Sequence, residues 1–132
     1  MLWPGYLAML ANHREGRNLP DDFTKHGMFA AIVDGELVGR AGIRFELNEM
    51  LAFRYGNVGY GVVEEHRRKG YATEILRQFL LILADEGISP ALVTCWDHNI
   101  DSGKVIENNG GQLESIVPDK DGIPFRRYWV TI

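Results

Sequence analysis

Two patterns of apolar and polar positions alternate along the chain, one with the period of a β-strand and one with that of an α-helix. Residues 28–33 and 37–47 are apolar or alternate between apolar and polar, which predicts two strands. Asp34-Gly35 lies between them, and this dipeptide is typical of a tight hairpin turn. We therefore expect an antiparallel hairpin.

The second predicted strand has one polar face. Gly42, Arg44 and Glu46 alternate there with apolar residues, so these residues are expected to point away from the core. Residues 48–56 are predicted to form a loop, and residues 57–63 a third strand.

The third predicted strand leads into the most regular helical pattern. Gly59 and Gly61 lie in that strand, which indicates that another backbone or a ligand approaches it closely. Residues 70–86 carry apolar side chains at helical spacing and end at Gly87, a typical C-terminal stop. The apolar positions of this helix are Ala72, Ile75, Leu76, Phe79, Leu80 and Leu83.

A short apolar run follows the helix and completes a strand–helix–strand unit. Residues 91–96 are predicted to form a buried strand parallel to the third one, because such crossovers join parallel strands. A second helix is expected over residues 99–109, with Asn99 as its N-cap. Two closing strands are expected near residues 112–117 and 125–132. The turn residues between these elements are Gly110-Gly111 and Asp121-Gly122.

The first part of the chain has a less regular pattern. Residues 7–11 form a short apolar patch that predicts a helix, and residues 12–22 are polar and rich in turn formers. No repeat, linker or low-complexity segment interrupts the chain. We therefore expect a single domain that spans residues 1–132.

Composition and charge narrow the classes of function. With 132 residues, of which 45% are apolar, the chain can bury a core without disulfides or metals. Its single cysteine, Cys95, favours a reducing, cytoplasmic location. The net charge of -4 argues against a nucleic-acid partner. No apolar run reaches the roughly 20 residues of a membrane span, so no membrane association is expected.

The most informative segment joins the third strand to the following helix. Three consecutive cations, Arg67, Arg68 and Lys69, precede Gly70 at the predicted start of the helix. Unpaired N–H groups of a first helical turn, together with the positive end of the helix dipole, bind anions such as phosphate. A solvated turn is the alternative interpretation of the three charges.

Two familiar phosphate-binding motifs do not fit this stretch. Gly59-x-Gly61 is followed by Glu64 where the dinucleotide fingerprint has its third glycine, and the chain has no GxxxxGK[ST] loop. The sequence therefore argues against a nucleotide hydrolase.

A different phosphate signature does match. Arg67-x-x-Gly70-x-Ala72, placed after a strand and at the start of a helix, resembles the acetyl-CoA signature of the GNAT acetyltransferase superfamily. Residues 44–48 and 126–129 resemble a bacterial subgroup of largely uncharacterised members of that superfamily.

A second block lies further along the chain, in the expected order. Asn99-x-x-Ser102, followed by Asn109-Gly110, resembles the second conserved block of the GNAT superfamily. The resemblance covers residues 28–132. Two blocks in order are more specific than either block alone.

The resemblance implies an α+β fold with a mixed, mostly antiparallel sheet, whose central parallel strands splay apart and are flanked by helices. GNAT domains open with a strand, and only one helix is expected before Met28, so the N-terminal strand is expected to be missing. The closing strands carry more apolar surface than an exposed edge strand should show, which predicts a homodimer. Their large apolar residues are Phe125, Tyr128, Trp129 and Val130.

The resemblance also implies acetyl-CoA as cosubstrate. The pantetheine arm would lie between the splayed strands and pair with the backbone of Val62 and Val63, where one N–H would polarise the thioester carbonyl. Asn99 and Ser102 would contact the pantetheine or hold the strands apart, although capping the helix is a sufficient role for Asn99. The phosphates would be held by Arg67, Arg68, Lys69, Gly70, Tyr71, Ala72 and Thr73.

Transfer of the acetyl group to a primary amine needs a base, because such an amine is protonated at neutral pH. Glu46, on the predicted polar strand face, is the first candidate, ahead of the ionisable residues at the end of the third strand. Ile106 occupies the position of the tyrosine that serves as acid in many relatives. The thiolate would then leave without full protonation, or Tyr60 or Tyr128 would protonate it, although both tyrosines could simply pack in the sheet.

These residues predict an N-acetyltransferase that moves the acetyl group of acetyl-CoA to a primary amine of a small molecule or protein. A non-catalytic CoA-binding or regulatory module and a structural domain are the alternatives. Cys95, Asp97 and His98 do not form a convergent ligand set, so no metal is expected. The acidic composition favours cationic acceptors.

Overall fold

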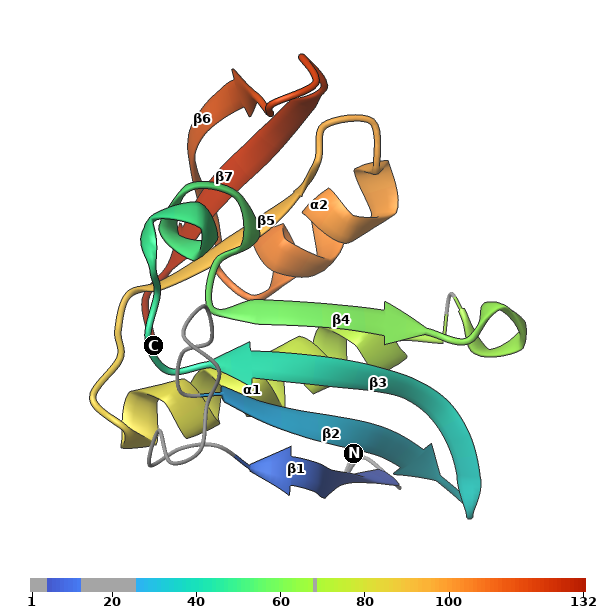
Figure 1. Ribbon diagram of the computed structural model, residues 1–132. Helices are drawn as coiled ribbons and strands as arrows, with labels where there is room; N and C mark the ends of the chain where they lie inside the picture. Colours follow the sequence, from blue (N-terminus) through green and yellow to red (C-terminus); the bar gives the residue numbers. More distant parts are fainter. Residues whose placement is uncertain (1–4, 13–25, 68) are drawn as a thin grey trace.

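A computed structural model describes residues 5–12, 26–67 and 69–132 of the chain. The first four strands form one antiparallel sheet in chain order (Figure 1). These strands are β1 (Gly5–Asn12), β2 (His26–Val33), β3 (Glu36–Arg44) and β4 (Val58–Val62). Asp34 and Gly35 have positive φ values of 52° and 79°, as the predicted hairpin turn between β2 and β3 requires.

The last three strands form a second antiparallel sheet, in which β7 lies between β5 and β6. Its strands are β5 (Ala91–Trp96), β6 (Gln112–Pro118) and β7 (Pro124–Val130). The helices are α1 (Tyr71–Asp85) and α2 (Ile100–Asn108), with a short π-type segment η1 (Leu51–Tyr55) and a 3-10 segment η2 (Glu64–His66). The α+β class and the strands and helices predicted after residue 26 are confirmed, with small shifts at their ends. The loop predicted over residues 48–56 is wrong, because it contains η1.

The first described element is a strand, and here the sequence-based expectation is wrong. Residues 5–12 pair antiparallel with residues 27–33 of β2. Neither the helix predicted over residues 7–11 nor the missing N-terminal strand is found. A short apolar run has no period that separates helix from strand, so pairing with β2 decides its conformation. The polar segment 13–22 lies outside the described residues.

Helix α1 covers one face of the first sheet and supplies much of the core. Its buried residues are Ile75, Leu76, Phe79, Leu80 and Leu83, all of which follow from the helical spacing. The ring of Phe79 packs edge-on against Phe29 of β2, with 5.0 Å between ring centroids. In Figure 1, α1 lies behind β2, β3 and β4, and the described helices leave the front face of these strands uncovered.

Most of the apolar side chains on which the homodimer prediction rests do not lie on an exposed edge. β7 is the central strand of the second sheet, and Phe125, Tyr128 and Val130 are buried within the chain itself. These side chains therefore do not support the predicted homodimer. The edge strands of this sheet are β5 and β6, and on β6 the side chains of Leu113 and Ile116 are half-exposed.

Arg127 of β7 fastens η1 onto the second sheet. Its Nη1 donates hydrogen bonds to the carbonyl oxygens of Ala52 and Phe53, and its Nε donates to Glu114 Oε1 at 2.8 Å. Arg127 and the indole N–H of Trp129 together lower the pKa of Glu114 to about 2. Glu114 therefore orients the arginine that positions η1.

Because the pKa of Glu114 is lowered in the folded chain, its contribution to stability is present above the ordinary value of 4.5 and is lost as the pH falls towards about 2. As the pH falls from about 5 to about 2.5, we expect the free energy of unfolding to decrease less in Glu114→Gln than in the wild type. Urea unfolding measures this difference. Glu49→Gln is the control, because it removes an exposed carboxylate away from this contact. An equal pH dependence in wild type and Glu114→Gln would contradict this role.

Candidate functional site

Strands β4 and β5 meet at one point and diverge from it. Asn57, just before β4, donates its backbone N–H to the carbonyl oxygen of Leu92 at 2.7 Å. Gly56 has a φ of +71°, and an added Cβ would lie 2.4 Å from the same oxygen, so only glycine fits there. Beyond this vertex the two strands belong to separate sheets and move apart in the same general direction (Figure 1). The predicted splay of the central strands is confirmed.

The side chain of Asn57 completes the vertex. Its Oδ1 accepts the N–H of Leu92 at 2.9 Å, and its Nδ2 donates to the carbonyl oxygen of Arg44 at 2.9 Å. Asn57 is only 4% exposed, so one buried amide links β3, β4 and β5. Sequence reasoning missed this residue, because a single asparagine at a strand end has no distinctive pattern.

We expect Asn57→Ala to lower the free energy of unfolding by about 2–4 kcal/mol, because it leaves the N–H of Leu92 and the carbonyl of Arg44 buried without these partners. Urea denaturation measures this change. Asn109→Ala is the matched control, since the Asn109 side chain also donates to two carbonyl oxygens but is only half-buried. A loss at Asn57 no larger than at Asn109 would contradict the role of Asn57 as a buried bridge.

The backbone of β4 alternates between groups bonded to β3 and groups that point into the gap between β4 and β5. Val63 donates its N–H to the carbonyl oxygen of Val38 at 2.8 Å, and its own carbonyl accepts the N–H of His66 at 2.8 Å. Because antiparallel ladders alternate, the N–H groups of Tyr60 and Val62 point away from β3. Both backbone groups of Val63 are thus used within the protein, and of the two residues predicted to pair with pantetheine only Val62 presents a free N–H to the gap.

A pair of hydroxyl groups spans the gap. The hydroxyl oxygens of Tyr60 on β4 and Ser102 in the first turn of α2 lie 3.4 Å apart. Burial raises the pKa of Tyr60 to about 12, with the hydrogen bond to Ser102 acting in the opposite direction, so the phenol keeps its proton at neutral pH. Asn99 caps α2 by accepting the N–H of Ser102 at 3.1 Å. Burial also raises the pKa of the nearby Cys95 thiol, which suppresses its reactive thiolate form.

Tyr128, the other candidate acid, has its hydroxyl engaged elsewhere. It donates to Glu107 Oε2 at 3.2 Å and accepts a hydrogen bond from Arg126 at 3.3 Å. Ile106 is fully buried in the core. Of the two tyrosines, only Tyr60 has its hydroxyl paired across the gap, with Ser102.

Glu46 does not lie on a strand face. β3 ends at Arg44, where the backbone N–H donates to the carbonyl oxygen of Asn57 at 2.7 Å, and the chain bends immediately afterwards. Glu46 is exposed in this bend. The predicted strand face at Glu46 is therefore wrong, because the alternating pattern continues past the point where the strand stops pairing.

The loop between β4 and α1 has the geometry expected of an anion site. Gly70 precedes the helix with a φ of +82°, in the left-handed region that favours glycine. The first hydrogen bond of the helix runs from the N–H of Glu74 to the carbonyl of Gly70. The N–H groups of Tyr71, Ala72 and Thr73 precede it and have no acceptor inside the helix.

The cationic residues of this loop differ in their contacts. Arg67 Nε donates to the carbonyl oxygen of Val62 at 3.0 Å, so this side chain braces the end of β4. Lys69 is exposed beside the start of α1. Arg68 lies outside the described residues.

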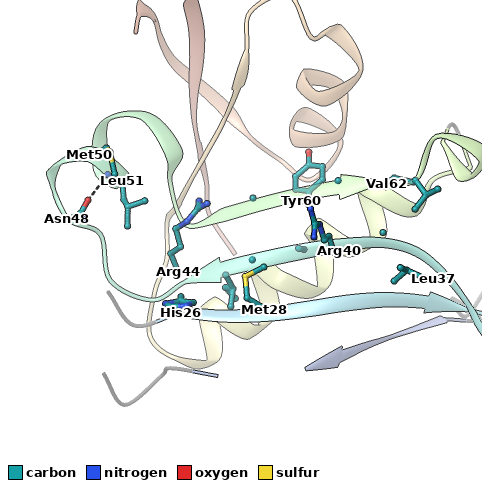
Figure 2. Close-up of a pocket in the computed structure, with 17 residues that line it drawn as sticks. His26, Met28, Leu37, Arg40, Arg44, Asn48, Met50, Leu51, Tyr60 and Val62 are labelled. Carbon is teal, nitrogen blue, oxygen red and sulfur yellow. Dashed lines mark hydrogen bonds between the residues drawn. The ribbon is translucent and has the colours of Figure 1, made fainter. Parts of the chain in front are cut away.

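A groove of about 1090 Å³ lies on the face of β2, β3 and β4 opposite α1 (Figure 2). Its floor is rich in glycine, with Gly42 of β3 paired to Gly59 of β4 and Gly61 two positions further on. The close approach predicted at Gly59 comes from the protein's own Arg44, whose guanidinium lies 3.1 Å from the position of an added Cβ. The groove extends along β4 as far as Val62. Sequence reasoning did not find it.

The described part of the chain contains neither a membrane-spanning helix nor a cluster of metal ligands. No helix there is long and apolar enough to cross a membrane. No three histidine, cysteine, aspartate or glutamate side chains of these residues converge on a point where they could hold a metal ion.

Several solved structures with a similar fold are acetyltransferases. The ribosomal L7/L12 alpha-N-protein acetyltransferase RimL, in complex with coenzyme A, is 20% identical with a TM-score of 0.69, over 91% of this chain and 65% of that one. The microcin C7 self-immunity acetyltransferase MccE, in complex with acetyl-CoA and AMP, is 15% identical with a TM-score of 0.66, over 81% of this chain and 61% of that one. AAC(6')-Ib, in complex with ribostamycin and coenzyme A, is 16% identical with a TM-score of 0.66, over 80% of this chain and 64% of that one.

The chain thus spans 61% to 65% of the length of these structures. Among curated proteins, none matches it. The model of the family described as acetyltransferase (GNAT) domain matches residues 6–112, from within β1 to the start of β6. The chain therefore belongs to the GNAT acetyltransferase domain family.

Proposed function

We propose that this chain binds acetyl-CoA and transfers its acetyl group to a primary amine. The observation that carries the proposal is the gap between β4 and β5, which has the N–H of Val62 on its edge and opens beside the first turn of α1. The complexes of RimL and MccE with coenzyme A or acetyl-CoA support it. A cytoplasmic location is part of the same proposal.

In this proposal the diphosphate lies at the N-terminus of α1. The N–H groups of Tyr71, Ala72 and Thr73 donate to its oxygens, and the helix dipole favours the negative charge. Gly70 leaves open space, because no atom lies within 4 Å of the position of an added Cβ. Lys69 supplies a positive charge at the same end of the helix.

The pantetheine arm then lies along the free edge of β4. The N–H of Val62 donates to the thioester carbonyl, where negative charge develops as the amine attacks. One such donor typically contributes on the order of 100-fold in rate or more.

As the new C–N bond forms, the C–S bond breaks and the thiolate leaves. Tyr60 gives its proton to that sulfur, because the phenol stays protonated at neutral pH and lies in the gap beside Ser102. The attacking amine must lose a proton, and Glu46 is proposed to accept it through water, because Glu46 follows Arg44, which is bonded to Asn57 five residues before Val62. Glu46 lies in the chain between Arg44 and Asn48, both of which line the groove.

The proposal is tested by titrating acetyl-CoA into the protein in a calorimeter and then measuring thiol release with a panel of primary amines. Saturable binding together with amine-dependent release supports transfer. Binding without release supports the non-catalytic module, which Ile106 at the usual tyrosine position favours. An absence of binding contradicts both.

A further inference from the structure

The groove on β2, β3 and β4 is lined by basic side chains and, among the described residues, by no acidic ones that are charged at neutral pH. In the described part of the chain the basic ones are His26, Arg40 and Arg44, and no carboxylate is among the lining residues. The chain as a whole carries 18 acidic residues against 14 lysines and arginines. The described lining of the groove therefore has the opposite charge balance to the chain as a whole.

Arg44 is held in place at one end of the groove. Its Nη1 donates to the carbonyl oxygens of Tyr55 at 3.2 Å and Gly56 at 3.1 Å. These carbonyls fix the guanidinium but bring no full negative charge. Partial burial lowers the pKa of Arg44, which reflects the cost of keeping this charge away from water. An anion beside the guanidinium would offset that cost.

Arg40 lies on the same face of β3, four residues from Arg44 and therefore about 13 Å away along the strand. It is exposed, and no described residue forms a hydrogen bond or ion pair with it. Figure 2 shows both arginine side chains extending from β3 towards β4, with Met28 of β2 beside them. Gly42 lies between the two arginines and adds no side chain to the floor.

We propose that this groove binds the amine acceptor, and that the acceptor carries a carboxylate or phosphate group held by Arg44 and Arg40. The proposal rests on the acetyl transfer proposed above, because the groove extends to Tyr60 and Val62, where the thioester would lie. The planar guanidinium fork matches the oxygens of carboxylates and phosphates. The overall composition favours cationic acceptors, whereas the groove favours acceptors that carry an anionic group.

Matched acceptor pairs that differ in charge test the proposal by thiol release. We would compare O-phosphoethanolamine with ethanolamine, and glutamate with glutamine. In the wild type, the anionic member is expected to have a kcat/KM at least about tenfold higher, mainly through a lower KM. A preference for the neutral members would overturn the proposal.

Arg40→Gln is expected to reduce this preference to about threefold or less, and it should fold normally because no described contact is lost. Arg44→Lys keeps the charge but loses the fork, so an intermediate preference is expected. Arg77→Gln is the matched control, since Arg77 is an exposed arginine of α1 paired with Glu74. A preference that both groove variants retain in full would overturn the proposal.

Failure of acetyl transfer is separable from failure of the acceptor site. If no amine is acetylated, O-phosphoethanolamine is titrated into wild-type protein and Arg40→Gln, and binding is followed by NMR. Binding that is at least about tenfold weaker in the variant supports the anion site even without transfer. Equal binding, or none, overturns it.

Discussion

Replacing Gly70 by glutamate is expected to weaken acetyl-CoA binding by about 100-fold or more. A residue with a Cβ at a φ of +82° is strained by about 1–2 kcal/mol, which disturbs the start of α1. The new carboxylate would also stand beside the diphosphate and repel it. Calorimetric titration measures the affinity, and circular dichroism checks that the helix is intact.

Two variants separate the causes of that loss. Gly70→Ala introduces the strain without the charge, so a smaller loss is expected. Gly87→Glu makes the same substitution just beyond the other end of α1, at a φ of +80° and with no atom within 4 Å of an added Cβ. Affinity should be retained there. An equal loss in Gly87→Glu would show that general destabilisation, and not the loop, explains the effect.

The elements that sequence reasoning predicted correctly are those whose determinants are local. The spacing of Ile75, Leu76 and Phe79 needs only the period of a helix, and the positive φ values of Asp34 and Gly35 need only turn chemistry. The strand–helix–strand order then follows from the rule for crossovers. Such signals are readable because no distant contact has to be known.

The features that sequence reasoning missed depend on contacts between distant residues. Asn57 becomes a bridge only because Leu92, which is 35 residues away, meets it at the vertex. Strand β1 is a strand because β2 offers it a partner. Glu46 falls outside β3 because the backbone of Arg44 is bonded to Asn57. The spacing of apolar residues along the sequence does not show which of these distant residues pair.

The charge of the groove is also a consequence of register. Arg44 was predicted to lie on a polar strand face, and Arg40 belongs to the same predicted strand, but the overall charge of -4 pointed towards cationic partners. The pairing of β3 with β4 is what places both arginines over glycines. Arg40 lies opposite Gly61, and Arg44 lies beside Gly59. Net charge describes the whole surface, whereas acceptor choice depends on the few groups that line one groove.

Tyr60→Phe is expected to lower kcat for acetyl transfer by about 100-fold, while the affinity for acetyl-CoA changes by less than about threefold. The phenylalanine keeps the ring but removes the proton that the leaving thiolate needs, and a positioned acid typically contributes at least that much. Because the pKa of Tyr60 is raised to about 12, ionisation of this phenol should not limit kcat below about pH 10. Thiol release at saturating acceptor, measured from about pH 6 to about pH 10, provides both readouts.

Tyr128→Phe is the matched control for this prediction. Burial raises the pKa of Tyr128 as well, but its hydroxyl is bonded to Glu107 and Arg126, so kcat should stay within about twofold of the wild type. Ser102→Ala removes the partner of the Tyr60 hydroxyl and is expected to lower kcat less than Tyr60→Phe does. If kcat in Tyr60→Phe also stayed within about twofold, the proton would have to come from another group. Tyr60 would then be a packing residue of β4, the role that its position in a strand already allows.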